Sequence, residues 1–93
     1  EVYEINDLGL EVKNATESEL SIRGIKNGVK VSRALTKDMA RYGLEGIIIT
    51  KINDQDVKDI DDVKKIMNRR DYNEPIKMTF VNERGELNSF IFR

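Results

Sequence analysis

The side chains that most often perform nucleophilic and metal chemistry are missing from this sequence. It contains no histidine and no cysteine. A Ser-His-Asp or Cys-His catalytic site therefore cannot form, and the usual ligands of zinc are absent. We expect a chain with no catalytic residues, no metal site and no cofactor of its own.

The densest group of potential metal ligands is a run of aspartates late in the chain. They are Asp54, Asp56, Asp59, Asp61 and Asp62. An EF-hand calcium loop that began at Asp54 would need glycine at its sixth position and glutamate at its twelfth. The sequence has Asp59 and Lys65 there, so the pattern fails. These aspartates are more typical of a turn followed by a helix start.

One short stretch, residues 7–12, combines a glycine turn with a strand pattern. Gly9 can adopt backbone angles closed to other residues, so the N–H groups around Leu8, Gly9 and Leu10 can converge on an anion. The strand that follows would offer its main-chain groups to an incoming peptide if it lay at a sheet edge. The alternative is that Leu8 and Leu10, together with Ile60 and Met67 later in the chain, are ordinary core residues.

The composition limits the kind of protein and the kind of partner. The 93 residues suit one soluble globular domain, with 39% hydrophobic and 35% charged residues. The 16 basic and 17 acidic residues are interspersed and give a net charge of −1. This balance indicates neither nucleic-acid binding nor an anionic membrane surface, and no apolar run is long enough to insert into a bilayer. Because the chain starts at Glu1 without a signal peptide, we expect a mature segment or an excised domain.

The first third of the chain predicts short strands and a small helix. Residues 2–5 predict a lead-in strand or extended arm, and the alternation in Leu10–Asn14 predicts a half-buried strand. Thr16 and Glu19 form a capping-box pattern for a helix of one or two turns that ends at Gly24.

The middle of the chain predicts a strand and a second short helix. Residues 29–32 alternate as a strand does. Thr36 is placed to cap a helix that runs through Tyr42, with Met39 and Ala40 facing inward.

The remaining segments predict a central strand, one longer helix and a hairpin. Residues 47–52 form the most apolar and β-branched run, typical of a central strand. Residues 59–69 have an apolar stripe, acidic residues at the start and basic residues at the end, as expected of a helix. Residues 76–81 and 87–92 flank a turn at 82–85. Together these elements predict a single α+β domain.

Several segments resemble the body of a PDZ domain. They are Gly28-Val29-Lys30-Val31, Tyr42-Gly43-Leu44 and the run from Gly46 to Asn53. The element order is similar to the permuted PDZ of the HtrA/Deg serine proteases, and most similar to the second, C-terminal PDZ of such a protease. The resemblance implies a partly open β-sandwich or barrel capped by one longer and one or two short helices. It divides the single domain, 1–93, into a lead-in arm over 1–7 and a PDZ body over 8–93.

The chain departs from this family pattern in two loops. Ala34-Leu35-Thr36-Lys37 stands where the family has Gly-Ser-Pro-Ala, and Gly46-Ile47 replaces a Gly-Asp turn in a loop one residue shorter. Neither departure touches the implied groove, and both indicate a divergent member.

The resemblance implies a groove between the strand after Gly9 and the helix over 59–69. A peptide would pair antiparallel to this strand, with its terminal carboxylate on the amides of the glycine turn. On the helix, Ile60, Lys64 and Met67 would face the groove. The adaptable Met67 would give loose selectivity for an apolar final residue, and Arg70 would favour a carboxylate. The full expected site is Leu8, Gly9, Leu10, Glu11, Val12, Ile60, Lys64 and Met67.

The function implied is that of a peptide-binding module without catalytic activity. Its parent would be a serine endopeptidase of the periplasm or cell envelope that acts in protein quality control. Its partners would be apolar C-termini or extended segments of misfolded proteins, and the protease domain or other PDZ domains of the same assembly. The alternative is an assembly or interdomain docking module that controls oligomerisation and binds no free peptide.

Overall fold

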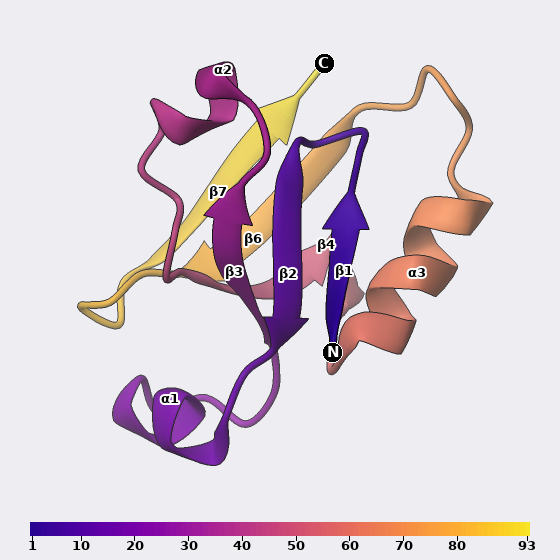
Figure 1. The fold of residues 1–93 in the computed structure, drawn as a ribbon. Helices are drawn as coiled ribbons and strands as arrows, with labels where there is room; N and C mark the ends of the chain where they lie inside the picture. The colour runs from indigo at the N-terminus through magenta and orange to yellow at the C-terminus, as the bar shows by residue number, and fades with distance from the viewer.

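The strands of the chain pair into one antiparallel sheet, shown in Figure 1 for a computed structural model that describes residues 1–93. The strand order is β1-β2-β3-β4-β6-β7, and β5 pairs with β4. The strands are β1 (Val2–Ile5), β2 (Leu10–Asn14), β3 (Val29–Ala34), β4 (Ile48–Ile52), β5 (Gln55–Asp56), β6 (Ile76–Val81) and β7 (Leu87–Phe92). The helices are α1 (Glu17–Ile22), α2 (Lys37–Ala40) and α3 (Ile60–Arg69).

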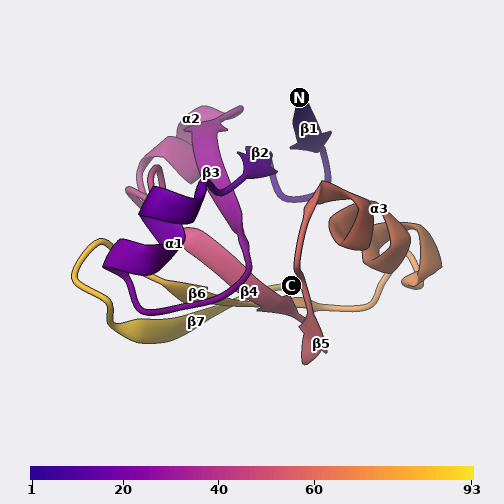
Figure 2. The same ribbon diagram turned by 90° about the horizontal axis from the view of Figure 1, so that it is seen from below.

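The sheet bends where β3 meets β4. Those two strands share only the pairs Val29–Ile49 and Lys30–Ile48. Beyond them, β1 and β2 lie over the layer formed by β4, β6 and β7, as Figure 2 shows from below. The longer helix α3 covers the open side of this sandwich next to β1 (Figures 1 and 2). The α+β class and the partly open sandwich with one longer and two short helices are confirmed.

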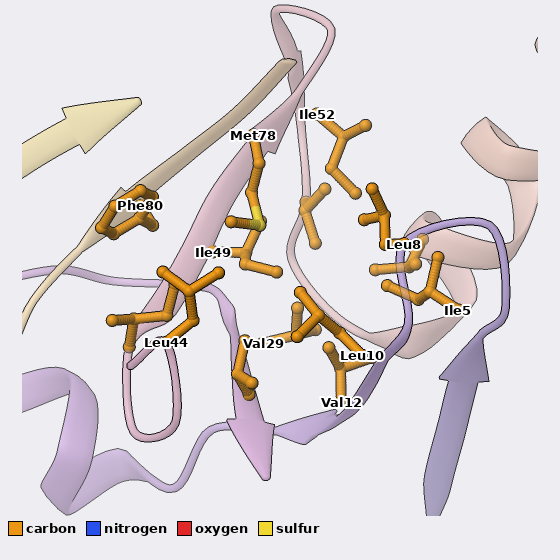
Figure 3. Packing of buried hydrophobic residues seen from close by; sticks show 14 of the residues in the cluster. Ile5, Leu8, Leu10, Val12, Val29, Leu44, Ile49, Ile52, Met78 and Phe80 are labelled. Atoms are coloured by element: carbon orange, nitrogen blue, oxygen red, sulfur yellow. The ribbon is translucent and has the colours of Figure 1, made fainter. Parts of the chain in front are cut away.

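The core lies between the two layers and is continuous. Eighteen buried hydrophobic residues form a single cluster, part of which is drawn in Figure 3. In β2 the alternation follows the expected pattern, since Leu10 and Val12 are fully buried while Glu11 and Lys13 are half-buried. Burial of these aliphatic side chains provides the main stabilisation of the sandwich.

The helix starts follow the capping chemistry of the sequence. In α1 the hydroxyl of Thr16 accepts from the Glu19 N–H at 3.1 Å, and the Glu19 carboxylate accepts from the Thr16 N–H at 2.9 Å. In α3 the Asp59 carboxylate accepts from the Asp62 N–H at 3.0 Å. These contacts satisfy backbone donors that a helix start leaves free. None of the three helices combines the length and the apolar character needed to cross a bilayer.

The second helix is shorter than its sequence predicts, and the inward placement of Ala40 is wrong. The α2 helix ends at Ala40, which is exposed, and only Met39 is buried. After it, the N–H groups of Tyr42 and Gly43 bond to carbonyls three residues back, at 3.2 and 3.3 Å. Adjacent residues on a helix point about 100° apart, so with Met39 turned into the core the neighbouring Ala40 faces solvent.

Candidate peptide-binding groove

The turn between β1 and β2 directs two backbone donors at one oxygen. The N–H groups of Leu8 and Gly9 both donate to the carbonyl oxygen of Ile5, at 3.0 and 2.8 Å. Gly9 has a φ of +72°, in the left-handed region. The turn therefore forms a small site for an oxygen atom, and in this structure a neutral backbone carbonyl occupies it.

The surroundings of Gly9 also disfavour a residue with a Cβ. A Cβ there would lie 3.1 Å from Met39 Cγ and 3.2 Å from Thr36 Cγ2. The carbonyl of Gly9 accepts a hydrogen bond from the Leu35 N–H at 2.8 Å. The turn is thus held against the segment that joins β3 to α2, so the expectation that the departure at residues 34–37 leaves the groove untouched is wrong.

The edge of β2 is covered by the chain's own first strand. β1 runs antiparallel to β2, with Ile5 opposite Leu10, Tyr3 opposite Val12 and Val2 opposite Lys13. Figure 1 shows β1 lying between β2 and α3. The strand edge that was expected to receive a peptide is therefore already paired.

The wall formed by α3 presents two of its three expected groove residues to β1. Lys64 and Met67 are half-buried. The Lys64 ammonium lies 5.5 Å from the centre of the Tyr3 ring and 3.6 Å from a carboxylate oxygen of Glu1. Met67 and residues 3–7 line a small hollow of about 180 Å³. Ile60, the third, is only 2% exposed and lies in the core cluster together with Val63 and Ile66.

A hydrogen bond fixes the width of the groove at its far end. The side-chain oxygen of Asn14, the last residue of β2, accepts from the Ile60 N–H at 2.8 Å. This contact joins the end of β2 to the first turn of α3, which has free backbone donors.

The outward face of β2 is engaged with β3. The Glu11 carboxylate accepts from the Ser32 hydroxyl at 2.8 Å and from Arg33 Nε at 3.0 Å. These contacts, that of Ser32 first, hold the pKa of Glu11 below its usual range. Glu11 therefore points away from α3, while Leu10 and Val12 point into the core.

Arg70, expected to attract a carboxylate, is already occupied. Its guanidinium bonds to an Asp7 carboxylate oxygen at 2.9 Å and to the backbone carbonyls of Tyr72 and Glu74. The Arg70 side chain is 10% exposed. It joins the glycine turn to the segment that follows α3, as a charge-assisted contact can.

The aspartates before and within α3 support local structure. Besides the Asp59 cap, an Asp62 carboxylate oxygen accepts from the Lys58 N–H at 2.9 Å. No three acidic side chains in the chain are arranged to hold a metal ion.

The structure adds residues that sequence reasoning did not assign to the site. Ile5 supplies the oxygen that the turn binds, Tyr3 contacts Lys64, and Asn14 links β2 to α3. The alternation in residues 2–5 indicated a strand, but the partner of that strand is not encoded locally.

A comparison with known proteins identifies the fold. No family model matches the chain, and no curated protein matches its sequence. Among solved structures, it is similar to the PDZ domain of HtrA3 bound to a phage-derived ligand, FGRWV, with a TM-score of 0.65 and 16% sequence identity. The match covers 99% of this chain and 81% of the HtrA3 chain. The expectation of a PDZ fold is confirmed.

Proposed function

We propose that this chain is a peptide-binding PDZ module that takes extended, apolar-ended segments against β2, beside α3. The observation that carries the proposal is the turn in which the Leu8 and Gly9 amides meet on one oxygen at the end of a paired strand. Donors arranged in this way suit a peptide carboxylate, whose charge strengthens each hydrogen bond. The ligand of the HtrA3 PDZ domain supports the same reading.

In this mechanism the peptide adds a strand antiparallel to β2. Its carboxylate would lie on the amides of Leu8, Gly9 and Leu10, and main-chain pairing along β2 would give affinity that does not depend on sequence. The last side chain would lie beside Met67, which is half-buried and adaptable. We expect a preference for apolar final residues with loose discrimination among them.

The wider context that we propose is an HtrA/Deg-like serine protease of the periplasm or cell envelope. A module of this kind would hold exposed C-termini or extended segments of misfolded proteins for a separate protease domain. The permuted element order and the likeness to the HtrA3 PDZ fold support a module of this type. The chain itself would contribute binding and no catalytic residue.

Calorimetric titration of the chain with matched peptides tests the binding. An apolar-ended peptide with a free carboxylate should bind at least about tenfold more tightly than its C-terminal amide, because the amide removes the charge that the turn would bind. Equal affinity for the two forms, or no binding by either, would contradict carboxylate recognition.

The alternative function is assembly or interdomain docking without free peptide binding. It is favoured by the coverage of β2 by β1 and by the opposite sheet edge, where Leu87 and Ile91 are 69% and 49% exposed on β7. Sedimentation of the chain over a range of concentrations tests self-association. If β7 forms an interface, Ile91→Lys should shift the population to monomer; a monomer at all concentrations before substitution would argue against self-assembly.

A further inference from the structure

We propose that β1 is a built-in occupant of the peptide groove, so that a peptide enters only by displacing it. The inference rests on the proposed function and adds its regulation and its ligand class. Three elements of a bound peptide are already present in β1: an antiparallel strand on β2, an oxygen on the Leu8 and Gly9 amides, and a final side chain, Ile5, that is 1% exposed.

The side chains of β1 alternate as those of a groove-bound peptide do. Ile5 lies in the core cluster and Tyr3 packs against it, beneath the Lys64 ammonium. Val2 and Glu4 face outward and are exposed. Because alternate side chains of an added strand enter its pockets, this pattern defines the ligand class. It is an extended peptide with a branched aliphatic final residue and an aromatic residue two positions before it.

β1 is held more firmly at its Ile5 end than at its Val2 end. At the turn, Ile5 is buried and its carbonyl accepts two hydrogen bonds, whereas at the other end Val2 is 52% exposed. The contact between Glu1 and Lys64 is made by half-exposed and exposed side chains and holds weakly. Opening from the Val2 end therefore leaves Ile5 as the main contact that a ligand must replace.

A free peptide and β1 differ in effective concentration and in the strength of their hydrogen bonds to the turn. β1 is joined to β2 through residues 6–9, so its effective concentration at the groove is on the order of millimolar. A free peptide lacks that advantage, but its terminal carboxylate bonds the Leu8 and Gly9 amides more strongly than the neutral Ile5 carbonyl does. The apparent affinity is then the intrinsic affinity reduced by the fraction of chains in which β1 is released.

An engineered disulfide in the full chain tests whether β1 must leave. Val2 and Lys13 lie directly opposite each other, and opposite residues in an antiparallel pair are about 4.5–5.5 Å apart, within reach of a disulfide. The chain has no cysteine of its own, so a Val2→Cys/Lys13→Cys variant forms one defined bond. The probe is the pentapeptide Glu-Val-Tyr-Glu-Ile with a free carboxylate, followed by fluorescence anisotropy.

The oxidised variant should bind this probe at least about tenfold more weakly than the same variant after reduction. The single Val2→Cys variant, taken as monomer, should not respond to the oxidant. A probe ending in aspartate in place of isoleucine should bind weakly in both redox states, because the Ile5 pocket is apolar.

A second variant should open the groove and so strengthen binding of the probe. Ile5→Ala removes most of the buried side chain that holds β1, and should tighten binding of the probe by about tenfold relative to the unsubstituted chain. Ile5→Val retains most of that side chain and should change the affinity by less than about threefold. Circular dichroism of each variant establishes that it is folded before binding is measured.

The outcomes separate this inference from the proposed function. Equal binding by oxidised and reduced forms would overturn displacement of β1 while leaving peptide binding in place. If neither the reduced variant nor a folded Ile5→Ala variant binds any free-acid peptide, the proposed function fails and the inference fails with it. Weaker binding on oxidation together with tighter binding by Ile5→Ala would support both.

Discussion

Replacement of Gly9 by alanine provides the most direct test of how the glycine turn is held. Two separate costs apply at this position. The φ of +72° is unfavourable for any residue with a Cβ, and the new Cβ would press on Thr36 and Met39 at 3.1–3.2 Å. Gly24 has nearly the same φ, +68°, but nothing lies within 4 Å of its Cβ position. Gly24→Ala is therefore a matched control that measures only the cost of the left-handed backbone conformation.

The two costs give different expected losses of stability. The left-handed conformation costs an ordinary residue about 1–2 kcal/mol, and part of this is offset because alanine reduces the conformational entropy of the unfolded chain. We expect the free energy of unfolding to fall by about 1 kcal/mol for Gly24→Ala. Close contacts add a cost of order 1–3 kcal/mol, so Gly9→Ala should lose about 2–4 kcal/mol.

Urea denaturation followed by circular dichroism measures both losses. Variants with the same m-value can be compared through their midpoints. A Thr36→Ser substitution removes the Cγ2 methyl but keeps the hydroxyl that caps α2. In the Gly9→Ala background it should restore part of the lost stability, as a double-mutant cycle would reveal.

Equal losses for Gly9→Ala and Gly24→Ala would refute this reasoning. They would mean that the contacts with Thr36 and Met39 relax without cost. The turn would then not be fixed by its packing, and its donors would not be preorganised for an oxygen atom.

Three further predictions concern contacts around the sheet. The hydrogen bond from Lys30, which has the largest effect, and the bond to Thr16 lower the pKa of Glu19 from 4.5 to about 2. Because the pKa of Glu19 is lower in the folded than in the unfolded chain, ionised Glu19 stabilises the fold. This stabilisation is present above about pH 5 and is lost as the pH falls toward 2. In thermal unfolding between pH 2 and 6, the Glu19→Gln variant should lose less stability on acidification than the unsubstituted chain does. Asn14→Ala should cost about 1–2 kcal/mol in urea denaturation, because the Ile60 N–H loses its acceptor, whereas Asn14→Asp should lose less. Gly28→Ala should cost about 3 kcal/mol by the same assay, since its Cβ would meet Ile48 and the backbone of β4.

Features that depend on neighbours in sequence are the ones that the sequence predicts well. The Thr16 capping box spans four residues, and both of its hydrogen bonds are present. The start of α3 at Asp59 and the alternation of β2 are local in the same sense. The inward placement of Ala40 fails because α2 is a single turn in which the adjacent Met39 already faces the core.

The site is predicted only in part, because its decisive contacts are between distant or competing segments. The glycine turn could be located from Gly9, and the position of α3 from its apolar stripe. The pairing of residues 2–5 with β2 could not, since an alternating tetrapeptide can pair with any free sheet edge. The bond between Arg70 and Asp7 spans 63 positions, and no local pattern indicates it.

The placement of β1 has a consequence for the rate of peptide capture. If the groove opens only when β1 leaves, the observed binding rate cannot exceed the rate of that opening, however much peptide is added. Stopped-flow traces should then approach a plateau with rising peptide concentration, and the plateau should be the same for different peptides. Ligands would differ mainly in how long they remain bound, so the chain would set the timing of capture and each ligand its duration.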